Sequence, residues 1–344
     1  MAGAVVTGRL LRLLSAVLTV LALCSAPARP DMAAEAQYLR IGTGPPGESY
    51  FQVGGLIATA LTSPPGAPFC RKRGPCGIPG VIASALATNG SASNAQALCN
   101  RTLDVGLVLS DIALWVDTGA APFQSRTATP LATIGALYPA QMQLVVRADS
   151  RIASPKDLKG KRVSLGIKGS GTLLHARQLL AAWSLSEADL KPSYMGPAEA
   201  ADTMLAGSLD AFFLVDAAPV PSVVELAKVL PIALVPLRGD PIDRLRRANT
   251  LLGPARIPAG TYSGQTEDVA TLDIRLMLVV AADMPDDLAY AIAEVMWNPA
   301  TLDRLSQSLP QGVAISPDQA MIGLGLPLHA GAVRYFQDAG LMRR

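Results

Sequence analysis

The sequence has few of the residues that catalytic and metal sites use most often. Its 344 residues include two histidines and four cysteines, and neither histidine lies near a cysteine in the sequence. It contains no G-x-S-x-G nucleophile elbow, no H-E-x-x-H zinc motif, no C-x-x-C pair and no complete P-loop. These absences argue against a metalloenzyme, a thiol redox protein and an NTPase. We therefore expect a protein that is not an enzyme and that holds neither a metal nor a cofactor.

Charged residues are also scarce. Asp, Glu, Lys and Arg make up 16% of the chain, and the formal net charge is +2. No stripe of Lys and Arg with interleaved aromatics is present, which argues against nucleic-acid binding. Half of the residues are apolar, so disorder is excluded and a well-buried α/β protein is favoured. The length exceeds that of most single cores and predicts two compact units.

Long apolar runs are absent beyond the N-terminus. There, two arginines precede an apolar run, 13–23, and small residues follow it at 25–28. This is the layout of a secretory signal peptide, which we place at residues 1–28 with cleavage near Ala28. A membrane span would need about 20 apolar residues. Lipidation at Cys24 is the less favoured alternative, because a small residue normally precedes such a cysteine. We expect export to the periplasm.

Export bears on the remaining cysteines. Cys70 and Cys76 flank a basic, turn-rich loop in which we expect a disulfide, because the periplasm is oxidising. Closing so small a ring would contribute about 2 kcal/mol in the chain-entropy model. Cys99 lies in a helical Ala/Leu pattern, and a buried thiol is expected there.

Glycine and serine, in contrast, gather in turns that follow strand patterns and start helices. In the clearest case, strand 163–167 leads through Gly169, Ser170 and Gly171 to a helix beginning near Thr172. The glycines, which lack side chains, allow a ligand to come close to the backbone, and the first helical N–H groups have no partner within the helix. With the two hydroxyls, they suit a carboxylate or similar anion. An ordinary strand-to-helix turn with a Thr cap explains this stretch equally well.

A second turn lies at 42–47 and matches G-x-G-x-x-G. It lacks the acidic residue about 20 positions later that would hold a ribose, so we reject a dinucleotide site. The segment is better interpreted as a glycine-rich turn before helix 53–61, with Tyr50 and Phe51 available to line a cavity.

The third turn, 88–94, opens the predicted helix 95–100. Its Ser91, Ser93 and Asn94 can cap that helix or contact a ligand. Ligands of open α/β sheets bind at the carboxyl ends of strands, where all three turns fall. This arrangement favours a cleft that captures a small anion without transforming it, with hinge closure around the ligand.

Strand and helix patterns alternate along the whole chain, which predicts parallel sheets covered on both faces. A polar, turn-rich stretch at 149–161 marks entry into a second domain. The predicted strands are 38–41, 105–109, 131–136, 142–146, 163–167, 211–215, 232–235 and 276–281; the predicted helices are 53–61, 95–100, a helix from 110, 173–183, 199–206, 220–229, 285–297 and 332–339.

The two histidines are interpreted as structural or surface residues. His175 lies one turn into its helix, and His329 follows an apolar C-terminal stretch. A nucleophile pair of Ser170 with either histidine would make the protein a secreted serine hydrolase, but nothing in the spacing supports that alternative.

Several short segments, weak one by one, carry a resemblance through their order. They are 41–44 with Tyr50, 88–94, 110–111, 136–139, 157–164, 169–172, 209–213, 257–262 and 327–331, together with the pair Cys70 and Cys76. In these segments the chain resembles the TAXI family, the extracytoplasmic solute receptors of TRAP transporters, over nearly all of its length after the signal peptide.

The resemblance implies a type II periplasmic-binding fold of two α/β lobes. Lobe I would comprise 37–145 and 238–344, and lobe II 146–237. It also implies a monomer that binds a small organic anion (a glutamate-like amino acid, a 2-oxoacid or a dicarboxylate) and delivers it to a TRAP-type membrane permease. The alternative is the same binding fold used as the ligand-sensing partner of a membrane signalling protein.

The ligand shell implied by the resemblance is Tyr50, Ser91, Asn94, Gly169, Ser170, Gly171 and Thr172. The chain departs from the family around this shell. Leu109, Ala140 and Gln143 replace the usual Gln, Glu and His, and Asp216 opens the segment that is usually Gly-Gly-Tyr-Pro. Lys168 stands where the family rarely has a cation; it would add charge to the anion site or be a solvated lysine. These departures predict a changed ligand more than a changed fold.

Overall fold

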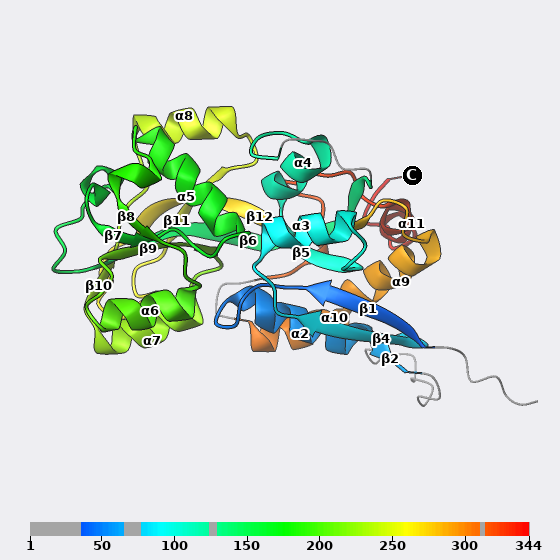
Figure 1. The fold of residues 1–344 in the computed structure, drawn as a ribbon. Helices are drawn as coiled ribbons and strands as arrows, with labels where there is room; N and C mark the ends of the chain where they lie inside the picture. The colour runs from blue at the N-terminus through cyan, green and yellow to red at the C-terminus, as the bar shows by residue number, and fades with distance from the viewer. Residues whose placement is uncertain (1–35, 65–76, 124–128, 310–313, 344) are drawn as a thin grey trace, which may run out of the picture. The chain divides into compact units, whose positions relative to one another are not determined.

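The computed structural model describes residues 36–64, 77–123, 129–309 and 314–343, which belong to one compact unit, Ala36–Arg344 (Figure 1). The predicted signal peptide at 1–28, the lipidation alternative at Cys24 and the predicted disulfide of Cys70 and Cys76 lie outside the described residues. Within the described ranges, no helix has the length and apolar character needed to cross a membrane.

The strands form one mixed sheet in the order β3-β2-β4-β1-β5-β12-β6-β9-β7-β8, while β10 pairs with β6 and β11 with β12. The α/β fold class predicted from the sequence is confirmed. The strands are β1 (Gln37–Gly42), β2 (Thr62–Ser63), β3 (Ile78–Pro79), β4 (Val81–Leu86), β5 (Val105–Leu109), β6 (Leu131–Arg147), β7 (Arg162–Ser164), β8 (Lys191–Ser193), β9 (Ala211–Asp216), β10 (Ile232–Leu234), β11 (Gly253–Ile257) and β12 (Val269–Ala281).

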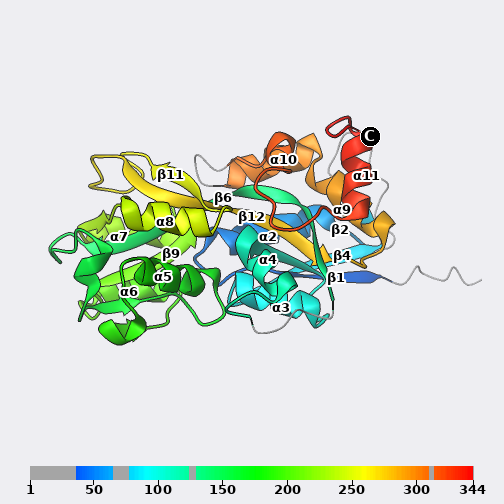
Figure 2. The same ribbon diagram turned by 90° about the horizontal axis from the view of Figure 1, so that it is seen from above.

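The expectation of parallel sheets was wrong for the middle of this sheet. Strands β4, β1 and β5 are parallel neighbours, as are β9, β7 and β8 in the second group. Between the groups run the two longest strands, β6 and β12, which are antiparallel to each other. β12 pairs antiparallel with β5 of the first group, and β6 pairs antiparallel with β9 of the second. Figures 1 and 2 show these two strands passing from one group to the other.

Strand β6 was predicted as two pieces, 131–136 and 142–146, because Pro139 lies between them. The structure has one continuous strand across this residue. Pro139 pairs with Arg275 of β12, whereas β9 pairs with β6 only from Gln141 onward. The proline therefore lies where one side of β6 has no partner strand, so its missing N–H costs no ladder hydrogen bond. The predicted lobe boundary between 145 and 146 falls inside this strand, and the lobe assignment stays a prediction.

Helices lie on both faces of each strand group. In the first group, α3 and α4 lie on one face and α2 and α10 on the other; in the second, α5 and α8 lie opposite α6 and α7 (Figure 1). The helices are α2 (Ser49–Leu61), α3 (Ser91–Cys99), α4 (Ser110–Thr118), α5 (Gly171–Ala182), α6 (Pro197–Leu205), α7 (Pro221–Val229), α8 (Asp240–Ala248), α9 (Asp286–Met296), α10 (Pro299–Ser308) and α11 (Ala330–Asp338).

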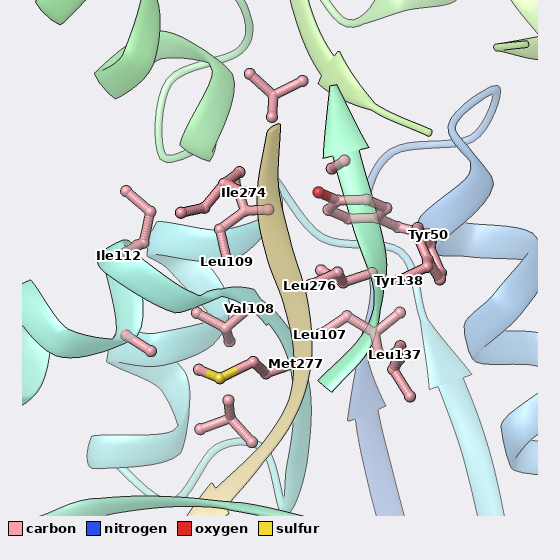
Figure 3. Packing of buried hydrophobic residues seen from close by; sticks show 14 of the residues in the cluster. Tyr50, Leu107, Val108, Leu109, Ile112, Leu137, Tyr138, Ile274, Leu276 and Met277 are labelled. Atoms are coloured by element: carbon pink, nitrogen blue, oxygen red, sulfur yellow. The ribbon is translucent and has the colours of Figure 1, made fainter. Parts of the chain in front are cut away.

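The hydrophobic core lies around the strands that helices cover on both faces. Strand β5 is buried at every position, and β6 and β12 are buried along most of their length. Such continuous apolar runs are typical of strands covered on both faces. Figure 3 shows side chains of β5, β6 and β12 packed together, among them Leu107, Tyr138 and Leu276. Cys99, predicted to be buried, is half-buried at the end of α3 because that face of the helix meets solvent.

Several helices and strands were not predicted from the sequence, namely β2, β3, β4, β8, β11, α8 and α10. Helix starts were also placed too late: α2 begins at Ser49 rather than Val53, and α3 at Ser91 rather than Ala95. The omitted first turn of α3 is polar, and polar residues break the apolar periodicity on which the prediction rested. The omitted turn of α2 contains Tyr50 and Phe51, which the sequence analysis assigned to the preceding glycine-rich turn. The first turn of α2 binds Asp216 at the end of β9, and the first turn of α3 binds the turn before α5.

Candidate ligand site

Four helices begin just beyond the carboxyl ends of strands. Helices α2, α3 and α4 follow β1, β4 and β5, which are parallel neighbours, so the three helix starts lie at one edge of the sheet. Helix α5 follows β7 of the other strand group. Its start nevertheless reaches α3, because the N–H of Ser93 donates to the carbonyl of Gly169 at 2.9 Å. The predicted turns at 88–94 and 169–172 are therefore in direct contact.

Two residues of the predicted shell, Ser91 and Asn94, are buried and hydrogen-bonded to the backbone. The Ser91 hydroxyl accepts from the Leu109 N–H at 3.2 Å. The Asn94 amide nitrogen donates to the carbonyls of Thr43 (2.7 Å) and Leu107 (2.9 Å), which ties the end of β1 to β5. The Asn94 side-chain oxygen has no hydrogen-bond partner among the described residues. Asn94 thus has a structural role in addition to any contact with a ligand.

The third turn is closely packed against the second. Gly169 has φ of +89°, a backbone conformation that favours glycine, and a Cβ at this position would lie 2.3 Å from the Ser93 hydroxyl oxygen. Any other residue would therefore be strained in its backbone and would clash with Ser93. The Ser170 hydroxyl caps α5 by accepting from the Leu173 N–H at 3.1 Å. The Thr172 hydroxyl accepts from the Val215 N–H at 3.2 Å. Gly171 also packs tightly, since a Cβ there would lie 2.7 Å from Leu109.

Lys168 does not join this group. Its side chain is exposed, and its Nζ lies 4.9 Å from the centroid of the Tyr194 ring. The structure therefore favours the solvated lysine over a cation added to the anion site. The positive charge that the sequence places beside the turn lies outside the cluster of buried polar groups.

Asp216 is the polar residue whose position the sequence could not settle. The structure buries it at the end of β9, with 1% of its surface exposed. Its Oδ2 accepts from the Ser49 N–H at 2.8 Å, its Oδ1 accepts from the Ala217 N–H at 2.8 Å, and the Ser49 hydroxyl also donates to it. A carboxylate from the second strand group thus lies at the N-terminus of α2, where the helix dipole stabilises an anion.

Two tyrosines and a second carboxyl surround Asp216. The Tyr138 hydroxyl lies 3.2 Å from that of Ser49, and the rings of Tyr138 and Tyr50 meet edge to face at 6.5 Å (Figure 3). The Tyr50 hydroxyl is buried and has no hydrogen-bond partner among the described residues. Glu48, 7% exposed, is the N-cap residue of α2, but its side chain does not cap the helix.

Burial governs the protonation of these groups. It raises the pKa of Asp216 to about 6, although hydrogen bonds from Ser49 and Ala217 act in the opposite direction. Burial also raises the pKa of Glu48 well above its ordinary value, and the negative charge of Asp216 adds to that effect. The pKa of the Tyr50 hydroxyl is raised by burial and by Asp216 as well. The site therefore resists further negative charge.

Apart from Lys168, the positions that depart from the TAXI pattern are buried. Leu109 and Ala140 are apolar residues of the core. Gln143 positions its neighbours: its Nε2 donates to the Asp216 carbonyl at 3.2 Å, and its Oε1 accepts from the Tyr262 hydroxyl at 2.7 Å. The loop between β11 and β12 is thereby connected to the end of β9. Sequence reasoning identified these positions as departures but could not reveal that two of them share one hydrogen-bond network.

Both histidines are buried, and their side chains form hydrogen bonds with residues other than Ser170. His175 Nε2 lies 2.9 Å from Asp111 Oδ2, both side chains are fully buried, and the Asn249 amide donates to the same carboxylate oxygen at 2.7 Å. His329 Nδ1 accepts from the Gly331 N–H at 3.1 Å and caps α11. Within the described ranges no group of three or more His, Cys, Asp or Glu residues is arranged to hold a metal.

The match to a protein-family model decides the family. The model described as the NMT1-like family matches residues 41–340. The chain belongs to the NMT1-like family. This match spans both strand groups and all four helix starts of the candidate site.

Solved structures with a similar fold share little sequence with the chain. The periplasmic aliphatic sulphonate binding protein SsuA from Escherichia coli is 18% identical, with a TM-score of 0.41 and 81% of each chain covered. The alkanesulfonate-binding protein SsuA from Xanthomonas axonopodis pv. citri, bound to MOPS, is 18% identical, with a TM-score of 0.44 and coverage of 91% of this chain and 96% of that one. A putative L-cystine ABC transporter from Listeria monocytogenes is 13% identical, with a TM-score of 0.47 and coverage of 81% and 98%.

Proposed function

We propose that this protein is a periplasmic solute-binding receptor that captures a small organic molecule bearing a carboxylate and delivers it to a membrane permease. The observation that carries the proposal is the contact between the N-termini of α3 and α5, where the Ser93 N–H donates to the Gly169 carbonyl and the hydroxyls of Ser91 and Ser170 lie. Helix N-termini offer unpaired N–H groups and a favourable dipole to an anion. Membership of the NMT1-like family is consistent with this role.

The resemblance to TAXI receptors supports a more specific version, in which the permease is of the TRAP type and the receptor acts as a monomer. It also supports export by the signal peptide at 1–28. In this version lobe I (37–145 and 238–344) and lobe II (146–237) close around the ligand, with β6 and β12 as the connecting strands. The contacts from Asp216 to Ser49 and from His175 to Asp111 join the two proposed lobes, so opening would have to break them.

A thermal-shift screen of the mature protein tests the proposal. The panel comprises amino acids, 2-oxoacids and dicarboxylates, each at several concentrations. A ligand at about a hundred times its dissociation constant should add about 2.7 kcal/mol of apparent stability, which is a clear rise in melting temperature. The rise must increase with ligand concentration. If no carboxylate in the panel shifts the melting temperature, the proposal is rejected.

A further inference from the structure

The N-terminus of α2 differs from those of α3 and α5 because a carboxylate of the chain already lies on it. Asp216 accepts hydrogen bonds from the Ser49 N–H and from the Ser49 hydroxyl, so both donors that this helix start offers at Ser49 are used. A ligand carboxylate cannot take the same position without displacing Asp216. The ligand's negative group must therefore bind elsewhere, and the α2 side of the site must recognise something else.

Two further polar residues, Glu48 and Tyr50, lie near Asp216. Glu48 is a buried residue with 7% of its surface exposed, and its carboxyl makes no hydrogen bond with a described residue. The Tyr50 hydroxyl is buried and unpartnered as well. Glu48 and Tyr50 flank Ser49, whose N–H and hydroxyl bind Asp216. A Cβ placed on Gly44 would lie 2.6 Å from Glu48 Oε2 and 3.3 Å from Tyr50 Cβ, so these two side chains lie on the same side of the α2 start. Leaving buried polar groups unpaired is costly, so the site is incomplete without further hydrogen-bond donors.

No positive charge of the described chain compensates the two carboxyls. Neither Glu48 nor Asp216 takes part in any of the ion pairs between described residues. Lys168, the nearest cation in the sequence to the anion turn, is exposed beside Tyr194. The missing partner is thus a group that donates several hydrogen bonds and carries positive charge. A protonated amine has these properties, with three donors and no acceptor.

We propose that the ligand carries a protonated amine and that Glu48 and Asp216 bind it, with the Tyr50 hydroxyl as a third contact. This inference rests on the proposed receptor function and narrows it. Of the ligand classes expected from the sequence, amino acids carry an ammonium group, whereas 2-oxoacids and dicarboxylates do not. The carboxylate of the ligand binds at the N-termini of α3 and α5.

The test compares ligands that differ only at the amine. Isothermal titration calorimetry on the mature protein uses matched pairs with the same carbon skeleton: glutamate with 2-oxoglutarate, alanine with pyruvate, and leucine with 4-methyl-2-oxopentanoate. Glutarate is the dicarboxylate without a substituent. For the pair that binds, we expect the amine-bearing member to bind on the order of ten- to a hundredfold more tightly.

Variants locate the amine site. Glu48→Gln keeps the size of the side chain and removes its charge, so the preference for the amine should fall about tenfold or more. The control is Glu199→Gln on the exposed face of α6, which should keep the preference of the wild type. An unchanged preference in folded Glu48→Gln would reject the assignment of this residue.

The outcomes separate the two proposals. If 2-oxoacids or glutarate bind as tightly as the amino acids, the amine site is rejected while the receptor function stands. If no member of any pair binds, both proposals fail. Should Glu48→Gln not fold, the wild-type comparison still decides whether the ligand must carry an amine.

Discussion

At the residue scale, the protonation of Asp216 determines how the site responds to pH. Burial raises its pKa to about 6, so the folded protein holds a proton there that the unfolded chain releases at lower pH. A carboxyl of this kind stabilises the fold most below the pKa of the unfolded chain, and the contribution is lost as the pH rises through about 6. Glu48, whose pKa is also raised, acts in the same direction.

The pH dependence can be measured with Asp216→Asn. We expect the unfolding free energy of the wild type, minus that of the variant, to fall between pH 4 and pH 7, at up to about 1.4 kcal/mol per pH unit for one proton. Urea denaturation at a series of pH values gives the difference. Asp210→Asn is the control: the hydrogen bond from Arg162 lowers the pKa of Asp210, so its difference should be flat above pH 5. A flat difference for Asp216 as well would show that this carboxyl is not perturbed by burial.

Asn94 is expected to matter for stability as well as for binding. Replacing it by Ala leaves the buried carbonyls of Thr43 and Leu107 without its amide donor. The Thr43 carbonyl keeps the bond from the Thr88 hydroxyl at 3.1 Å. We predict a loss of roughly 1–3 kcal/mol in unfolding free energy, the usual cost of losing a buried hydrogen-bond partner. Asn100→Ala, at the exposed end of the same helix, should cost much less. Equal losses in chemical denaturation would contradict the structural role of Asn94.

At the scale of elements, the sequence predicted the order of strands and helices well and the starts of helices poorly. The strand at 105–109 was predicted with its observed bounds, because an unbroken apolar run between polar turns is a strong signal. Helix α8 was missed, since its charged sequence has only one buried residue, Ile242. The placement of the turns at α3 and α5 after strands could be expected from the sequence, but their direct contact could not, because β4 and β7 belong to different strand groups. The contact of Asp216 with Ser49 could not, because 167 residues separate them and no local pattern links them.

Gly169 tests whether the turns at α3 and α5 are as closely packed as the structure shows. Gly169→Ala should destabilise the fold for two reasons, its positive φ and the approach of a Cβ to the Ser93 hydroxyl. Gly207→Ala is a matched control, because φ is +74° there but nothing lies within 4 Å of an added Cβ. The backbone strain alone should cost about 1–2 kcal/mol, so the loss at Gly169 should exceed that at Gly207. Thermal denaturation of both variants measures the comparison, and equal losses would mean that the turns are not in close contact.

At the scale of the whole molecule, residues far apart in the sequence are joined by a few buried polar contacts besides the shared sheet. Strands β6 and β12 connect the strand groups through the backbone. Asp111 and His175 connect α4 to α5 through side chains, and Asn249 adds a third segment. A receptor that opens and closes requires contacts of this kind, strong enough to hold the closed form and few enough to break together.

The two histidines allow a matched test of this coupling. His175→Ala removes one of the partners of the fully buried Asp111 carboxylate. We therefore expect faster hydrogen exchange in α5, in α4, where Asp111 lies, and in the preceding β5. His329→Ala removes a helix cap, and its effect should stay near α11. Hydrogen–deuterium exchange with mass spectrometry resolves these segments in the mature protein. A response to His175→Ala confined to α5 would mean that the pair does not couple the two strand groups. A joint response, suppressed again when ligand is added, would identify the Asp111–His175 contact as one that closure strengthens.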